Sequence, residues 1–431
     1  MWVVRIIAIL VVLGLGIGVN LLCYRRGVAV FAMPQRGRRI FALTLFGSVM
    51  AILLGRWVGG EGFARSVAVV GWSVQAGVLI SAALLLPTEA IRVIDAVVTR
   101  LRARFWAPPA DEVNAAEVSS PVAELPTAES FEVSDRGSEL SSGVPLHTTP
   151  QTRRAFLYRA AAGGALAVGA GSSVYGTFVE ARDYVIEERV FPLPGLPRSL
   201  EGYTLVQLSD LHFGPFVGRR ELERMVEMVR RAQPDAVVIT GDVIDSDPAV
   251  GPLVGRLVQR LRQYTRDGVF VIPGNHDYYA GVEELIRQVT GAGGRMLTDG
   301  NVLLGDGGGH FALLGVDDVW AYRYTQRPGP DLQRALQGVD PEMAKVLLCH
   351  NPSFFPEAAP YVDLQLSGHT HGGQISLFIN PAEYVLPHGF VRDAYQLGDS
   401  SLYVNRGIGT TGPPCRIGSA PEITKVVLTS V

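Results

Sequence analysis

The sequence has few cysteines and little net charge. Its 431 residues include three cysteines, Cys23, Cys349 and Cys415, which lie far apart along the chain. So few and scattered thiols exclude a disulfide framework and a zinc site built from thiolates. The net charge is −3, from 38 basic and 41 acidic residues. Because a surface that neutralises phosphates needs an excess of Lys and Arg, we expect no nucleic-acid partner.

The amino-terminal part lacks long polar stretches. The chain is 48% hydrophobic and its mean hydropathy is +0.22, which is too apolar for a purely soluble protein. Residues 1–106 are therefore predicted to form a membrane region with about three transmembrane helices, over 6–23, 40–54 and 66–86. The segment 40–54 is short, and an interfacial or tilted helix is the alternative there.

The arginines of this region predict its orientation. Five arginines lie between residues 25 and 39, and four lie between 92 and 104. By the positive-inside rule both groups lie in the cytoplasm, so the amino terminus lies outside. We therefore expect a multi-pass protein of the inner (plasma) membrane.

The next segment changes character. Residues 107–151 are rich in Pro, Ser, Ala and Glu, a composition typical of an acidic disordered linker. Arg153 and Arg154 then precede a mildly apolar Ala/Gly run over 152–180. This run resembles a twin-arginine export signal, and an ordinary membrane helix is the alternative. Both interpretations place the rest of the chain outside the cytoplasm, and we expect the run to remain as a fourth membrane segment.

Residues 184–431 are predicted to form a globular α/β domain. Residues 219–234 carry apolar side chains at helical spacing between two predicted strands. This βαβ unit favours parallel pairing, with ligands at the carboxyl ends of the strands. Five short apolar runs, each followed by a polar loop, are the predicted strands: "YTLVQL", "DAVVIT", "GVFVIP", "AKVLLC" and "DLQL".

The loops after these strands carry metal-binding side chains. One loop alone, "SGHTHGG", would be a weak signal, but five of the eight histidines fall in this set of loops. Seven donors are more than one ion requires and are enough for two ions that share a carboxylate. A mixture of imidazoles and carboxylates suits Mn, Fe or Zn better than Mg or Ca. The seven candidate ligands are Asp210, His212, Asp242, Asn275, His350, His369 and His371.

The order of these motifs resembles a known family. D-x-H, G-D, G-N-H-D, H and G-H-x-H follow one another as in the calcineurin-like metallophosphoesterases, and "SGHTHGGQ" resembles their membrane-associated branch. The resemblance implies a layered β-sheet sandwich flanked by helices, here preceded by an α-helical membrane region. It also implies two divalent transition-metal ions that share Asp242. One would take Asp210, His212 and His371 as further ligands, and the other would take Asn275, His350 and His369.

The resemblance implies a catalytic pair as well. His276 would face the phosphoryl group as a proton donor, and Asp277 would hold its imidazole in place. Two ions would acidify a bridging water and neutralise the phosphoryl oxygens, so that a hydroxide attacks in line. Asp245 and Asp247 follow in the loop after Asp242. They could support the ligands, but the favoured interpretation is that they are plain loop acids.

These features predict a membrane-anchored, dinuclear-metal phosphoesterase. Its substrate is a phosphate ester or pyrophosphate, and the membrane region favours a lipid-linked one. One alternative is an enzyme like the UDP-2,3-diacylglucosamine pyrophosphatases of lipid A synthesis, which the outside location opposes. Another is a membrane sensor that binds a ligand without turnover. The sequence leaves the oligomeric state open.

Overall fold

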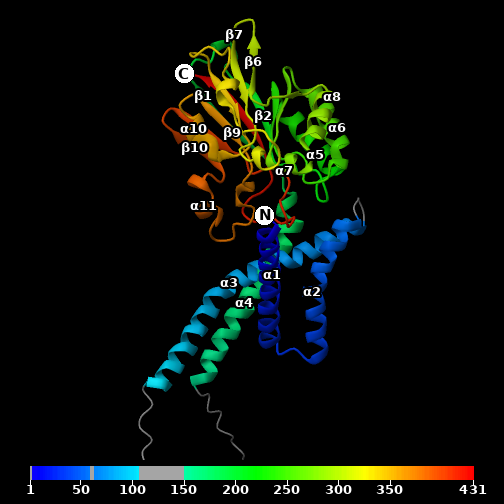
Figure 1. Ribbon diagram of the computed structural model, residues 1–431, viewed down its shortest axis with the longest axis vertical. Coiled ribbons are helices and arrows are strands. Elements are labelled where there is room, and N and C mark those ends of the chain that lie inside the picture. The colour runs from blue at the N-terminus through cyan, green and yellow to red at the C-terminus, as the bar shows by residue number, and fades with distance from the viewer. Residues whose placement is uncertain (1, 59–62, 106–149) are drawn as a thin grey trace, which may run out of the picture.

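The computed structural model describes residues 2–58, 63–105 and 150–431. A group of long helices lies on one side of a larger α/β domain (Figure 1). The acidic linker predicted over 107–151 falls almost entirely outside the described residues, which resume at Pro150.

Two of the long helices could cross a membrane, by length and composition. They are Gln35–Leu54 within α2 and Phe63–Arg102 within α3. The segment 40–54 therefore belongs to a longer helix than its apolar run indicates. The long helices are α1 (Trp2–Val30), α2 (Gln35–Val58), α3 (Phe63–Phe105) and α4 (Pro150–Phe178).

Polar contacts join these helices. The Asn20 side-chain amide of α1 donates to Gln75 Oε1 of α3 at 3.0 Å, and the hydroxyls of Ser73 in α3 and Ser173 in α4 lie 3.1 Å apart. The turn between α1 and α2 lies at the end of the helices away from the α/β domain, whereas the end of α4 meets that domain (Figure 1). The five predicted cytoplasmic arginines lie in the last turns of α1 and the first turns of α2, on either side of this turn. They therefore lie at the opposite end of the helices from the α/β domain.

The first sheet is mostly parallel and has six strands in the order β1-β12-β2-β3-β4-β5. The predicted βαβ unit is confirmed, because β2 and β3 pair in parallel with Leu205 opposite Ala236. Both strands are buried along their whole length, which explains their continuous apolar runs. The strands are β1 (Val185–Leu193), β2 (Tyr203–Leu208), β3 (Ala236–Thr240), β4 (Gly268–Ile272), β5 (Arg295–Met296) and β12 (Glu422–Ser430).

The second sheet has six strands in the order β10-β11-β9-β8-β7-β6. The predicted strands "AKVLLC" and "DLQL" are β8 and β9, which pair in parallel at its centre. The strands are β6 (Gly300–Asp306), β7 (Gly309–Gly315), β8 (Lys345–Leu348), β9 (Leu364–Ser367), β10 (Asp393–Leu397) and β11 (Ser400–Val404).

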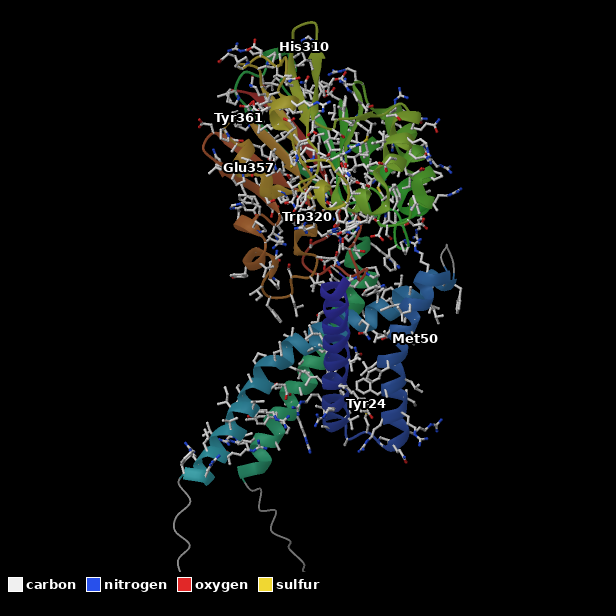
Figure 2. The ribbon with its side chains drawn as sticks, in the orientation of Figure 1. Tyr24, Met50, His310, Trp320, Glu357 and Tyr361 are labelled. Atoms are coloured by element: carbon white, nitrogen blue, oxygen red, sulfur yellow. The ribbon has the colours of Figure 1, made fainter. Side chains whose placement is uncertain are left out.

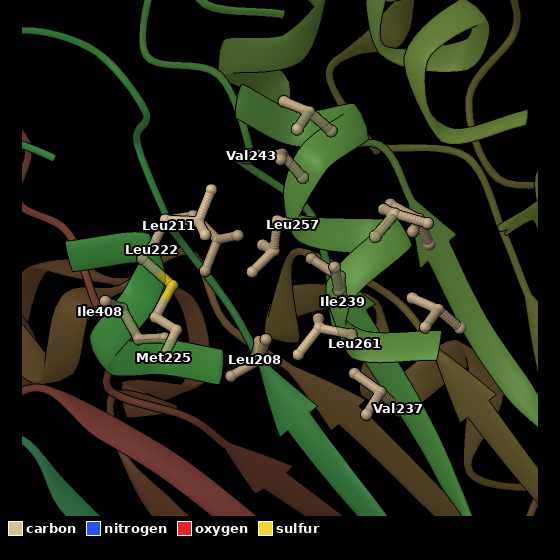
Figure 3. Packing of buried hydrophobic residues seen from close by; sticks show 14 of the residues in the cluster. Leu208, Leu211, Leu222, Met225, Val237, Ile239, Val243, Leu257, Leu261 and Ile408 are labelled. Atoms are coloured by element: carbon tan, nitrogen blue, oxygen red, sulfur yellow. The ribbon is translucent and has the colours of Figure 1, made fainter. Parts of the chain in front are cut away.

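The two sheets pack face to face with helices outside them. One buried cluster joins the sheets, with Val238 of the first and Leu366 of the second among its members. A second cluster lies under α5 and α6, and Figure 3 shows Leu222 and Leu257 of these helices and Ile239 of β3 among its members. The predicted layered sandwich is confirmed. Its helices are α5 (Arg219–Ala232), α6 (Gly251–Leu261), α7 (Asn275–Ala280), α8 (Val282–Gly291), α9 (Leu332–Ala335), α10 (Phe355–Ala358) and α11 (Ala382–Val385).

Candidate metal centre

The predicted ligands all follow the carboxyl ends of strands. Asp210 and His212 come after β2, and Asp242 comes after β3. Asn275 follows β4 and begins α7, His350 follows β8, and His369 and His371 follow β9. Because these strands belong to two sheets that face each other, seven side chains from five loops can meet at one edge of the sandwich.

The backbone is strained at these loops. Five of the seven candidate ligands have positive φ, between 47° and 73°. Such left-handed backbone costs a non-glycine residue about 1–3 kcal/mol and is concentrated at functional sites. Gly241, which also has positive φ, lies so close to a ligand that a Cβ there would be 2.7 Å from His350 Nδ1. The strain aims these side chains inward. The five residues are Asp210, His212, Asp242, His369 and His371.

The first cluster of ligands contains Asp210, His212 and His371, whose ligand atoms all lie within 4.8 Å of one another. The Nε2 atoms of the two histidines are 3.1 Å apart, and His371 Nε2 is 3.5 Å from Asp210 Oδ1. All three residues are buried.

The second cluster contains Asp242, His350 and His369. Asp242 Oδ2 lies 3.3 Å from His350 Nε2, and His350 Nε2 lies 3.3 Å from His369 Nδ1. The two histidines of "GHTHGG" therefore serve different clusters: His369 joins the second and His371 the first.

Asp242 lies between the two clusters. Its Oδ2 atom is 3.7 Å from His212 Nε2 of the first cluster, while the same atom faces His350 of the second. The opposite positive charge of His350 and a hydrogen bond from it outweigh burial, which acts the other way, and hold the pKa of Asp242 well below its usual range. An ionised carboxylate that faces both imidazole sets has the position expected of a shared ligand.

The spacing of the donors fits transition metals. Two ligands each about 2.1 Å from one ion in tetrahedral geometry lie about 3.4 Å apart, and the donor pairs of the two clusters lie 3.1, 3.3 and 3.5 Å apart. His350 Nδ1 donates to the Thr240 carbonyl at 2.7 Å, which directs Nε2 toward the other donors of the second cluster, an orientation typical of metal-binding histidines. Asn275 Oδ1 is buried and has no hydrogen-bond partner among the described residues, as expected of an oxygen that binds a cation.

Two histidines are held neutral, the form that binds metals. Burial and the charge of His350 lower the pKa of His369 to about 3. Burial, His212 and Arg416 hold the pKa of His371 well below its usual range.

His276 borders the two clusters and is partly exposed, with 19% of its side chain accessible. Its Nδ1 donates to the Asp245 carbonyl at 2.8 Å, and its ring meets the edge of the Tyr279 ring at 5.0 Å between centroids. Its Nε2 is therefore the ring nitrogen left without a hydrogen bond among the described residues, which suits a group that reaches substrate.

The expected role of Asp277 is wrong. Its carboxylate accepts hydrogen bonds from the backbone N–H groups of Val243, Ile244 and Gly274, at distances from 2.9 to 3.3 Å, and none from the imidazole of His276. Asp277 is fully buried and ties the loop after β3 to the loop after β4. It therefore positions the loops that carry Asp242 and Asn275.

The expectation that Asp245 is a plain loop acid is also wrong. Its Oδ1 lies 3.3 Å from His212 Nδ1, and its carbonyl orients His276. Asp247, by contrast, is exposed and only accepts from the Ala249 N–H. Asp245 thus supports two site histidines, His212 through its carboxylate and His276 through its backbone carbonyl.

Sequence reasoning missed two residues of the carboxyl-terminal loop. Thr411 Oγ1 lies 3.0 Å from His371 Nε2. Arg416 is fully buried, donates to backbone carbonyls that include those of Arg406 and Ser419, and lies 3.3 Å from His371 Nδ1. The only sequence signal for Arg416 is a charged residue within an apolar, glycine-rich stretch.

Aromatic side chains border the site. The Trp320 ring meets the edge of the His369 ring at 5.1 Å between centroids. Tyr279 is exposed and its hydroxyl lies 2.7 Å from that of Tyr324, whereas the neighbouring Tyr278 is buried and bonds Asp317. Figure 2 shows Trp320 at the end of the α/β domain near the long helices and His310 at the opposite end. The candidate site therefore faces the helices.

Comparison with known proteins relates the chain to one family. Residues 203–373 match the calcineurin-like phosphoesterase family, a range that contains all seven candidate ligands. A Bos taurus protein named "Transmembrane protein with metallophosphoesterase domain" is 36% identical over 274 residues, which are 59% of this chain and 60% of that protein. The chain thus matches about three fifths of this relative.

A shorter relative matches almost completely. The "Uncharacterized metallophosphoesterase YkuE" of Bacillus subtilis is 31% identical over 294 residues, which cover 65% of this chain and 98% of that protein. Among solved structures, a 5'-nucleotidase precursor from Thermus thermophilus is 16% identical, with a TM-score of 0.33 over 53% of this chain and 54% of that one. The family uses divalent metals, and the Asp and His clusters described above could bind them. The match of the whole YkuE protein shows that this chain belongs to the calcineurin-like metallophosphoesterase family.

Proposed function

We propose that this protein hydrolyses a phosphate ester or pyrophosphate with two divalent transition-metal ions, Mn, Fe or Zn. The position of Asp242 carries the proposal, since one carboxylate oxygen faces His212 at 3.7 Å and His350 at 3.3 Å. In the proposed site Asp210, His212 and His371 hold one ion, and Asn275, His350 and His369 hold the other. When bound, the ions would activate water and offset the negative charge of the phosphoryl oxygens.

The protein groups around the ions position the substrate and move a proton. His276 gives a proton from Nε2 to the leaving oxygen while its Nδ1–H stays bonded to the Asp245 carbonyl. Asp245 orients His212 through Nδ1, and Asp277 fixes the two loops beneath the ligands. None of these steps requires a covalent bond between enzyme and phosphate.

The proposal includes a location and a substrate class. Residues 1–106 and 152–180 anchor the chain as a multi-pass protein of the plasma membrane, 107–151 link them, and 184–431 act outside the cytoplasm. The arginines that flank the turn between α1 and α2 support this orientation, because that turn lies at the far end of the helices from the α/β domain (Figure 1). Since the candidate site faces the helices, a lipid-linked phosphoester is the favoured substrate.

The test uses the full chain purified in detergent. Its metal content is measured by mass spectrometry, and hydrolysis of a nitrophenyl monoester, a nitrophenyl diester and a lipid-linked pyrophosphate is assayed with and without chelator. We expect about two ions per chain and metal-dependent hydrolysis of at least one substrate. A chain with both ions bound that hydrolyses none of them would instead support the membrane-sensor alternative.

A further inference from the structure

A cavity of about 640 Å³ lies where the long helices meet the α/β domain. Its walls come from the first turns of α3, the end of α4, the start of α5 and the carboxyl-terminal loop that contains Gly409 and Thr410. The cavity is separate from the metal clusters, since none of the seven candidate ligands lines it.

One part of the cavity wall is strongly basic. Four arginines and one glutamate, Glu221, are its charged lining residues. Arg65 of α3 lies 3.4 Å from Glu221, so one positive charge has a partner within the wall. The other three charges have no carboxylate partner among the described residues. They belong to Arg182, Arg220 and Arg224.

The three arginines are held in different ways. Arg224 donates to the Arg182 carbonyl at 2.8 Å and stacks over the Tyr184 ring, while Arg182 stacks over Phe178. These contacts fix the two guanidinium groups without neutralising them. Arg220 is exposed and makes no hydrogen bond or ion pair with any described residue, so its donors are available to a ligand.

Another part of the wall is apolar. Val69 and Val70 of α3 and Phe178 of α4 line it, and both valines fall within the candidate membrane span Phe63–Arg102. The cavity therefore places a basic surface directly beside helix surface that is apolar enough to contact acyl chains.

We propose that this cavity binds an anionic phospholipid, with its phosphate against Arg220 and Arg224 and its acyl chains along Val69, Val70 and Phe178. Arginine suits a phosphate because its planar donors bind two oxygens at once. A free phosphate would use the basic wall and leave the apolar wall exposed to water. A neutral lipid would leave three unpaired arginines beside a membrane, where clustered positive charge favours anionic headgroups.

The same loop joins this cavity to the metal centre. Gly409 and Thr410 line the cavity, while the Gly409 N–H donates to the Asp210 carbonyl at 2.7 Å and Thr411 contacts His371. A lipid in the cavity would therefore rest against the backbone that supports the first ligand cluster. This binding goes beyond the proposed hydrolysis and does not depend on it.

The test measures lipid binding without turnover. The full chain is delipidated in detergent with a chelator, then titrated with phosphatidylglycerol or phosphatidylcholine, and bound lipid is counted by native mass spectrometry. Arg220→Gln removes the available guanidinium, and Val69→Trp fills the apolar part. The matched control is Arg231→Gln at the other end of α5, where Arg231 is exposed and pairs with Glu227 outside the cavity.

We expect the parent chain and the control to retain one phosphatidylglycerol more tightly than phosphatidylcholine. Arg220→Gln should weaken the binding of phosphatidylglycerol by about tenfold, the usual effect of losing one charge-assisted hydrogen bond. Val69→Trp should weaken the binding of both lipids. Equal retention by all three variants would overturn the proposal. So would equal affinity for the two lipids, or displacement of phosphatidylglycerol by inorganic phosphate alone. Lipid binding is measured here without metal. A chain that binds lipid in this assay but hydrolyses nothing when metal is supplied would therefore count only against the proposed hydrolysis.

Discussion

The Nε2 atom of His212 lies 3.1 Å from the Nε2 atom of His371, although 159 residues separate them in the sequence. Both rings are buried, and Thr411 Oγ1 lies 3.3 Å from the first nitrogen and 3.0 Å from the second. Two imidazole nitrogens that face each other with a carboxylate nearby are arranged for a cation between them, which both can bind at once.

Asp242→Asn should weaken both metal binding and turnover, because it removes the charge that both clusters face. We expect clearly fewer than two ions per chain and a loss of activity beyond about 100-fold, since even residues outside the ligand set change metal sites by about 10–100-fold. Metal content and hydrolysis of a nitrophenyl diester are measured on the same samples. The control is Asp247→Asn in the same loop. The Asp247 side chain is exposed, so this substitution should leave metal content and hydrolysis unchanged. Full metal content in Asp242→Asn would refute the shared-carboxylate arrangement.

His276→Gln should keep both metals and lose rate. His276 Nδ1 is bonded to the Asp245 carbonyl and Nε2 is free, so the substitution removes a proton donor and costs about 10²–10⁴-fold in turnover. The loss should shrink for leaving groups as acidic as nitrophenol, which need little protonation. A series of aryl and alkyl esters measures this dependence. Tyr279→Phe, which keeps the ring against His276, is the control, and an equal loss across the series would exclude His276 as the proton donor.

Arg416→Met should destabilise the carboxyl-terminal loop and the first ligand cluster. Burial lowers the pKa of Arg416 to about 10, so the guanidinium remains charged at neutral pH and holds several backbone carbonyls. Leaving them unpaired should cost more than about 3 kcal/mol of unfolding free energy. Thermal unfolding is followed by maleimide labelling of the three buried cysteines.

The control for this variant is Arg392→Met. Arg392 is less buried and donates to one carbonyl, that of Gly418, so its loss should cost less than about 1 kcal/mol. Equal losses of unfolding free energy in the two variants would contradict the prediction that the buried Arg416 stabilises the fold more than Arg392 does.

The orientation of the chain is testable with fusions. Because the arginines beside the turn between α1 and α2 lie at the opposite end of the helices from the α/β domain, a reporter active only in the cytoplasm should be silent after Val431. The same reporter inserted within 110–150 should be active. Activity at Val431 would place the α/β domain in the cytoplasm and restore the lipid A alternative.

The sequence alone determined the strands and the ligand types. The runs that became β2, β3, β4, β8 and β9 are mainly apolar because both faces of each strand are largely buried, and this pattern is visible locally. The carboxylates and imidazoles follow directly after these strands, so their identity and order could be predicted. The βαβ unit also predicted the parallel pairing of β2 with β3, which brings their two loops to one edge. The loops after β8 and β9 reach the same edge because the second sheet packs against the first.

Only the tertiary structure decided how these groups contact one another. His369 and His371 are two residues apart, yet the left-handed backbone at both positions places their side chains in different clusters. Asp277 bonds backbone N–H groups and Asp245 holds the histidines, an exchange of roles that spacing could not reveal. The side chain of Arg416 depends on loop backbone carbonyls and on His371, 45 residues away, and the basic cavity joins segments hundreds of residues apart. Local periodicity specifies which face of an element is buried, whereas partners across such distances are selected only when the sheets and helices pack together.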